Sequence, residues 1–217
     1  MTRGETGAKK TPKRRMRRAD RHQQLIDVAR VAFAQRGYYG TSIEHVAELA
    51  GISKPIIYDH FTDKEGLYEA VVRGEIEFLT ESTLEAVEES FDDLYQLLER
   101  TTMAVLDYAE EHPMGFQIIA RYPMSFEHPS LEGNLWWSSL LGEFSSTLAA
   151  AFGRVLKKYG HDDTSIQLYT HIIVGAIELA TRWWGSGRNT AGYTKEQVAK
   201  YCVSLLWNGL DRLPVEP

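Results

Sequence analysis

Apolar residues recur every three or four positions through most of the chain, and this spacing constrains the fold more than any other feature. Leu25, Ala29 and Phe33, for example, fall on one face of a helix predicted over residues 21–36. Runs that alternate with a period of two, the pattern typical of strands, are missing. The same spacing predicts further helices over residues 41–50, 53–61, 63–88, 91–111, 114–122, 130–159, 163–184 and 194–211. The sequence therefore predicts an all-α fold.

The residues around the first predicted helices match known helix starts and stops. Gly37 is expected to end the first helix in the left-handed conformation. Thr41 and Glu44 stand three apart, as in a capping box that opens the second helix, and Thr62 and Glu65 repeat this pattern before the fourth. The second and third helices are joined by a short turn that contains glycine, which is the plan of a helix-turn-helix.

Charge is distributed unevenly along a chain whose net charge is −6. Residues 1–21 hold nine Lys or Arg and two acidic residues, whereas residues 71–217 hold eleven basic and twenty-one acidic residues. Only the N-terminal end therefore favours a polyanion. Residues 1–20 lack apolar periodicity, so we expect a flexible basic arm that adds phosphate or minor-groove contacts to DNA, or else a solvated tail.

Several classes of protein are disfavoured by what the sequence lacks. The single cysteine, Cys202, cannot form an internal disulfide or a cysteine-based metal cluster. No stretch of eighteen uncharged apolar residues and no apolar signal core is present, so the expectation is a cytoplasmic protein with no membrane partner. The histidines form no His-Glu-x-x-His pair and the glycines form no phosphate-binding loop, so we expect no enzyme, metal or cofactor.

A dense set of residues between positions 22 and 70 carries the strongest signal. It reads Gly37-Tyr38-Tyr39-Gly40-Thr41-Ser42-Ile43, Val46-Ala47, Ala50-Gly51-Ile52-Ser53-Lys54, Tyr58, His60-Phe61 and Lys64-Glu65. This combination resembles the N-terminal domain of TetR-family transcriptional regulators. The resemblance implies an all-helical homodimer with a DNA-binding domain at residues 21–68 and an effector-binding and dimerisation domain at residues 69–217. Pro55 departs from the family pattern, in which many members have Gly, and Gly66 softens a usually strong helix start.

The resemblance also implies which residues contact DNA. Thr41 and Ser42 are expected to bind phosphate at the start of the second helix. The exposed side of the third helix is expected to read bases through Ser53, Lys54, Pro55, Ile56 and Tyr58. His60 and Lys64 stand where family members hold the sugar-phosphate backbone. Each has a simpler alternative as a packed or surface residue, whereas Ile57 and Phe61, four apart, are expected in the core.

The C-terminal part holds all five tryptophans and many other aromatic residues. At any one position an aromatic residue is more often ordinary core than part of a binding site. The set as a whole predicts a ligand cavity between helices. The residues expected to line it are Leu106, Phe116, Ile119, Phe126, Trp136, Leu140, Phe144 and Ile173. Arg121 and Arg182 are candidates for an anionic head group, although Arg182 can instead pair with Glu178. The expected effector is apolar or amphipathic. The last helix loosely resembles members that sense fatty acyl-CoA, and a hydrophobic drug or aromatic compound is the alternative.

The helices predicted at residues 163–184 and 194–211 resemble the family's dimerisation pair, which forms a four-helix bundle with its mate. A two-fold dimer places two recognition helices on successive major grooves of a palindromic operator. The sequence thus predicts a repressor in which an effector shifts the long fourth helix and weakens DNA binding. Control of the opposite sign, and a ligand-binding module without DNA activity, remain alternatives.

Overall fold

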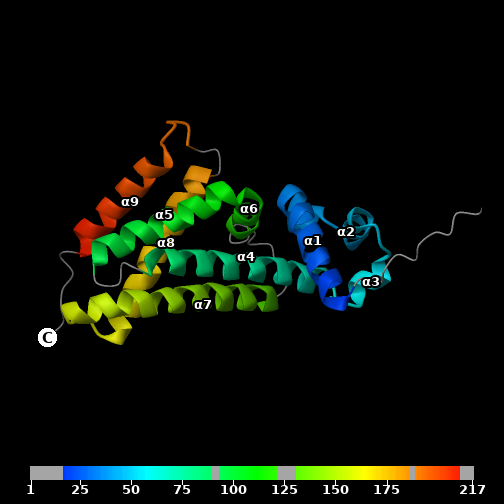
Figure 1. The fold of residues 1–217 in the computed structure, drawn as a ribbon, viewed down its shortest axis with the longest axis horizontal. Coiled ribbons are helices and arrows are strands. Elements are labelled where there is room, and N and C mark those ends of the chain that lie inside the picture. Colours follow the sequence, from blue (N-terminus) through cyan, green and yellow to red (C-terminus); the bar gives the residue numbers. More distant parts are fainter. Residues whose placement is uncertain (1–16, 89–92, 122–130, 186–188, 211–217) are drawn as a thin grey trace, which may run out of the picture.

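The structure is a computed structural model that describes residues 17–88, 93–121, 131–185 and 189–210. Every regular element within these ranges is helical, which confirms the predicted all-α fold (Figure 1). The helices are α1 (Arg18–Gly40), α2 (Ile43–Ala50), α3 (Lys54–Tyr58), α4 (Lys64–Val87), α5 (Leu94–Glu111), α6 (Pro113–Arg121), α7 (Leu131–Leu156), α8 (Asp163–Gly185) and α9 (Lys195–Leu210). A short 3₁₀ helix, η2 (Lys157–Tyr159), follows α7.

The first three helices and the start of α4 form a small domain at one end of the molecule (Figure 1). Its centre is apolar, because Leu25 of α1, Val46 of α2 and Ile57 of α3 are all fully buried. The ring of Phe33 meets the ring of Tyr68 edge-on, with 4.8 Å between centroids, and so joins α1 to α4. Ile57 and Phe61 are both buried, as predicted.

Several predicted boundaries change in the structure, and α3, predicted over residues 53–61, ends at Tyr58. The cap of α2 is Ser42, whose side chain accepts a hydrogen bond from the His45 amide, and the cap of α4 is Asp63, which accepts from the Gly66 amide. Each helix therefore starts one residue later than its predicted capping box requires. The helix α1 begins at Arg18, so the end of the predicted arm is helical, whereas residues 1–16 lie outside the described ranges.

Two glycines with a positive φ, Gly37 and Gly51, interrupt or end the first two helices. Gly37 has a φ of 69° and a ψ of 178°, so α1 is kinked at the predicted stop. The ψ differs from that of the expected left-handed cap, and α1 continues beyond the kink to Gly40. Gly51 ends α2 with a φ of 65° and a ψ of 37°, a left-handed conformation that glycine adopts without a Cβ penalty.

The remaining helices form the larger domain, with α5 packed against α4, α8 and α9. The helix α7 lies along α4 and α8, and α6 packs against α1 of the small domain. The long helix α4 joins the two domains, since its buried apolar residues from Leu67 to Val87 belong to one apolar cluster that includes residues of both. None of the helices in the described ranges is long and apolar enough to cross a membrane.

Candidate DNA interface and effector cavity

The helix-turn-helix presents α3 on the surface of the small domain. The left-handed Gly51 lets the chain reverse, and the Ile52 amide then donates to the Ala47 carbonyl at 3.0 Å. Pro55 lies in the first turn of α3, where backbone amides have no acceptor within the helix. Its lack of an amide hydrogen therefore removes no helical hydrogen bond. The buried Ile57 anchors the inner side of α3, so the short helix is held by one side chain and displays the rest.

The predicted base-reading residues lie on the outer side of α3. Ser53, Lys54 and Pro55 are exposed, and Ile56 is half-buried. Tyr58 is 51% exposed, so it does not pack inside the domain as the simpler alternative required. The structure therefore leaves four of these five residues exposed and Ile56 half-buried.

Lys54 forms an ion pair with Glu44 of α2 on this same surface. The hydrogen bond from the Lys54 ammonium lowers the pKa of Glu44 to about 2. The ion pair therefore links the lysine of α3 to α2. Sequence reasoning assigned Glu44 only to a capping box, because the ten-residue separation from Lys54 does not reveal that the two side chains meet.

The two candidate phosphate contacts at the start of α2 differ. Thr41 is only 2% exposed, and its hydroxyl donates to the backbone oxygens of Ala32 and Gly37, at 3.1 and 2.8 Å. A hydroxyl has one proton to donate, so that of Thr41 serves the fold and has none left for a phosphate oxygen. Ser42 is exposed and stands at the N-terminus of α2, where backbone amides favour an anion.

The other end of α3 is surrounded by basic groups from α1. Arg18 donates to the Asp59 carbonyl at 3.1 Å, and the ring of His22 lies 5.6 Å from that of His60. Burial, followed by the nearby His22 and Arg18, lowers the pKa of His60. The sequence placed Arg18 in a flexible arm, whereas the structure ties it to the recognition helix.

Lys64, the second candidate for gripping the DNA backbone, is partly engaged by the small domain. Its ammonium lies 4.1 Å from the centre of the Tyr38 ring, and partial burial lowers its pKa. Lys64 as a whole is half-buried, at the first turn of α4.

An apolar cavity lies between α4, α5, α6, α7 and α8 of the larger domain. Its described lining is Ile76, Leu79, Thr101, Val105, Ile119, Phe144, Leu148, Val174, Ile177 and Glu178. Two of the predicted residues, Ile119 and Phe144, belong to this lining. The space between these side chains is about 50 Å³, which is room for one or two water molecules at about 30 Å³ each.

Other predicted cavity residues lie elsewhere. Leu106 packs against α9 with Val198 and Ala199, and Ile173 is fully buried in the helix-packing core. The ring of Phe116 packs closely against the backbone of Gly185. Arg182 pairs with Glu178, as the alternative interpretation held. Phe126 lies outside the described residues, and the structure describes only the helical backbone of Arg121, Trp136 and Leu140.

Thr101 is the polar residue of the cavity that sequence reasoning missed. It is 1% exposed, and its hydroxyl has no hydrogen-bond partner among the described residues. Its neighbour Thr102 is equally buried but donates to the Leu98 carbonyl at 2.7 Å. A buried hydroxyl without a partner is costly, so it marks a place where a polar ligand atom would be favoured.

An apolar surface covers the exposed sides of α8 and α9. Leu168, Ile172, Leu179 and Trp183 are exposed along α8, and Tyr201 and Leu205 are exposed on α9. Leu205 has 76% of its surface exposed. Large apolar side chains gathered on one surface are typical of a protein interface.

Comparison with known proteins agrees with this arrangement. The family model of bacterial regulatory proteins, tetR family, matches residues 25–71. The transcriptional regulator RutR of Escherichia coli O157:H7 is 31% identical over 149 residues, which are 66% of this chain and 68% of RutR. The transcriptional activator FasR of Mycolicibacterium smegmatis is 24% identical over 201 residues, which are 93% of this chain and 88% of FasR.

A solved structure shares the fold over both domains. The transcriptional regulator FadR from Bacillus subtilis, crystallised in complex with stearoyl-CoA, has a TM-score of 0.72 and 18% sequence identity, and the match covers 87% of this chain and 98% of FadR. The matched relatives are regulators of transcription rather than enzymes. The chain therefore belongs to the TetR family of bacterial regulatory proteins and is a DNA-binding transcriptional regulator.

Proposed function

We propose that the protein is a homodimeric repressor that binds a palindromic operator through α3 and releases it when an apolar or amphipathic effector enters the larger domain. The exposed outer side of α3, held by the buried Ile57, is the observation that carries the DNA-binding part of this proposal. We assign the DNA-binding role to residues 21–68 and the effector and dimer roles to residues 69–217.

In this proposal Lys54 reads a base edge while Ser42, His60 and Lys64 hold the sugar-phosphate backbone. Lys54 suits guanine, whose O6 and N7 atoms accept hydrogen bonds in the major groove, and Ile56 or Pro55 suits a thymine methyl group. Thr41 contributes no side-chain contact, because its hydroxyl donates inside the domain.

The DNA-binding part is tested by selecting duplexes from a random pool with the purified protein. We expect enrichment of a two-fold symmetric sequence whose half-sites are one helical turn apart, about 34–36 Å. The Lys54→Met variant should lose preference at one base pair of each half-site, by about 1–3 kcal/mol. Absence of any enriched sequence would contradict the operator proposal.

The apolar surface of α8 and α9 supports dimerisation through these two helices. Gly175 and Ala176 of α8 are small enough to let a second copy approach closely, and exposed Leu179 and Leu205 supply apolar surface on either side. Sedimentation of the full chain checks this, and a species that remains monomeric at micromolar concentration would contradict it.

We propose a fatty acyl-CoA as the effector class. The lining of the cavity supports an apolar chain, because eight of its ten described residues are apolar, and Thr101 offers one hydroxyl to an oxygen of the ligand. FadR from Bacillus subtilis, similar in fold, was crystallised with stearoyl-CoA. The ion pair between Arg182 and Glu178 leaves that side of the cavity without net charge.

The size of the cavity supports a mechanism of release. An acyl chain does not fit into about 50 Å³, so a ligand has to move the walls apart. Ile76 and Leu79 of α4 form one of those walls, and α4 continues into the DNA-binding domain. Displacement of α4 by the ligand would therefore turn the recognition helix away from its groove.

The effector part is tested with palmitoyl-CoA, using free coenzyme A as the control. We expect saturable binding of palmitoyl-CoA at one site per protomer and a fall in affinity for the selected duplex. Failure of palmitoyl-CoA to bind would contradict the acyl-CoA assignment, and mass spectrometry of small molecules that co-purify with the protein would then direct the search towards a drug or aromatic compound.

A further inference from the structure

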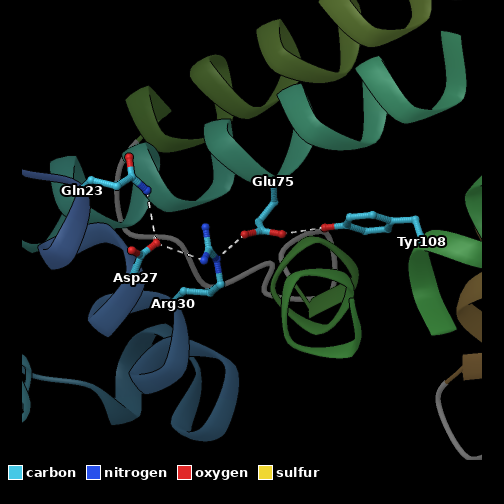
Figure 2. Close-up of polar contacts among 5 residues, drawn as sticks. All are labelled: Gln23, Asp27, Arg30, Glu75 and Tyr108. Atoms are coloured by element: carbon cyan, nitrogen blue, oxygen red, sulfur yellow. Dashed lines mark hydrogen bonds and ion pairs between the residues drawn. The ribbon is translucent and has the colours of Figure 1, made fainter. Parts of the chain in front are cut away.

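Glu75 is a buried carboxylate at the junction of the two domains. It lies on α4, next to the cavity residue Ile76, and is only 6% exposed. One of its oxygens pairs with the guanidinium of Arg30 on α1. The other accepts a hydrogen bond from the Tyr108 hydroxyl on α5 at 2.8 Å. Figure 2 shows that Glu75 stands between these two side chains, which approach it from opposite sides.

The contacts continue into the DNA-binding domain. The Arg30 guanidinium also donates to Asp27 at 3.2 Å, and Asp27 accepts from the Gln23 side chain at 3.1 Å (Figure 2). Burial, and then the negative charge of Glu75, strongly raise the pKa of Tyr108, so its hydroxyl stays protonated and remains a donor. The side chains from Gln23 to Tyr108 thus form a continuous polar chain across the junction.

Gly115 of α6 closes this arrangement from a third side. A Cβ atom on Gly115 would clash with a carboxylate oxygen of Glu75 and would lie 2.5 Å from the Tyr108 hydroxyl. The α6 backbone can therefore approach the carboxylate this closely only because residue 115 has no side chain. The helix α6 also packs against α1, so it contacts both domains.

These contacts permit few relative positions of the two domains. A buried carboxylate is costly unless donors satisfy both of its oxygens. The donors of Glu75 come from different domains, because Arg30 belongs to α1 and Tyr108 to α5. A rotation of α1 relative to α5 would remove one of these donors, so Glu75 would lose a hydrogen bond that the fold supplies.

We propose that Arg30, Glu75, Tyr108 and Gly115 are positioning residues that fix the angle between the DNA-binding and effector domains, and so set the half-site spacing that the dimer accepts. This inference rests on the proposed dimer and operator. It also gives α4 a second role, because a ligand that moves Ile76 moves the adjacent Glu75. None of the four residues belongs to the described lining of the effector cavity, and none lies on α3.

The test compares DNA affinities of the full-length dimer by fluorescence anisotropy. The duplex selected by the wild-type protein is used with its own spacing, with one base pair inserted between the half-sites, and with one base pair removed. A fourth duplex carries a single half-site. The variants are Tyr108→Phe, which removes only a hydroxyl, Gly115→Ala, and Glu75→Gln. Tyr95→Phe, at an exposed position on the same helix, is the matched control.

The wild-type protein and Tyr95→Phe should lose about tenfold or more in DNA affinity when the spacing changes by one base pair. Each base pair turns one half-site relative to the other by about a tenth of a helical turn. The affinity of Tyr108→Phe and of Gly115→Ala for the selected duplex should be roughly fivefold or more lower than that of the wild type. This is a typical size for the coupling between two sites. Their preference for one spacing should shrink to about twofold, while single half-site affinity stays within about twofold of wild type. Glu75→Gln should follow the same pattern.

Two results would overturn the inference. One is an equal loss of affinity on all four duplexes, which would mean that the contacts only stabilise the fold. The other is unchanged spacing preference in Tyr108→Phe and Gly115→Ala. A wild-type protein without any spacing preference would overturn the dimeric operator proposal, and this inference with it, and is recognised before any variant is measured.

Discussion

Replacing Thr101 by valine should stabilise the protein. The change exchanges a hydroxyl for a methyl group of nearly the same shape, at a position that is 1% exposed on the wall of an apolar cavity. The hydroxyl has no partner among the described residues, so its removal breaks no hydrogen bond. Both residues are β-branched, so the helical preference of α5 changes little.

The magnitude follows from the cost of a buried polar group without a partner, which is about 1–3 kcal/mol. We expect Thr101→Val to raise the free energy of unfolding by about 1–2 kcal/mol, because the cavity allows some solvation in the wild type. Thr102→Val is the matched control. It removes a hydroxyl that is equally buried but bonded to Leu98 at 2.7 Å, so it should lower the free energy of unfolding by about 0.5–1 kcal/mol.

Urea denaturation at a fixed protomer concentration measures both changes, since the stability of a dimer depends on its concentration. For a chain of this size, the expected gain for Thr101→Val corresponds to a rise in Tm of about 2–8 °C. The same variant should bind palmitoyl-CoA more weakly if the hydroxyl serves the ligand. Equal effects of the two valine substitutions, or a loss of stability in Thr101→Val, would refute the reasoning.

Further predictions concern the recognition surface, the two glycine environments and the dimer. Lys54→Met should return the pKa of Glu44 from about 2 towards its ordinary 4.5, which an NMR titration measures. In the wild type the ion pair stabilises the fold above pH 4.5, and this contribution is lost as the pH falls through about 2. An unchanged titration of Glu44 in the variant would contradict the ion pair. Gly51→Ala should lower the free energy of unfolding by about 1–2 kcal/mol, because the φ of Gly51 is 65°. Gly74→Ala, in open space within α4, should raise it by about 0.5–1 kcal/mol in the same denaturation assay. A similar result for both variants would count against the conformational argument. Leu205→Glu should convert the dimer into monomers in sedimentation without loss of helical content, and an intact dimer would move the interface elsewhere.

Local patterns determined the helices of this protein. Helical periodicity depends on residues three or four apart, so the faces containing Leu25 and Ile57 were predictable without any knowledge of packing. Gly37 was recognised as a stop because the left-handed conformation is a local property of glycine. The outer side of α3 was expected from the resemblance to TetR-family regulators, and the structure leaves Lys54, Pro55 and Tyr58 of this helix exposed.

Tertiary structure alone decided which side chains share an environment. Thr101 and Thr102 are adjacent and chemically identical, yet only the packing of α5 leaves one hydroxyl without a partner on a cavity wall. Glu75 is one acid among many on α4, and its burial depends on Arg30 and Tyr108, which stand 45 and 33 residues away. Hydrogen bonding and burial depend on distances in space, and no local pattern encodes which distant donors a folded chain brings to one carboxylate.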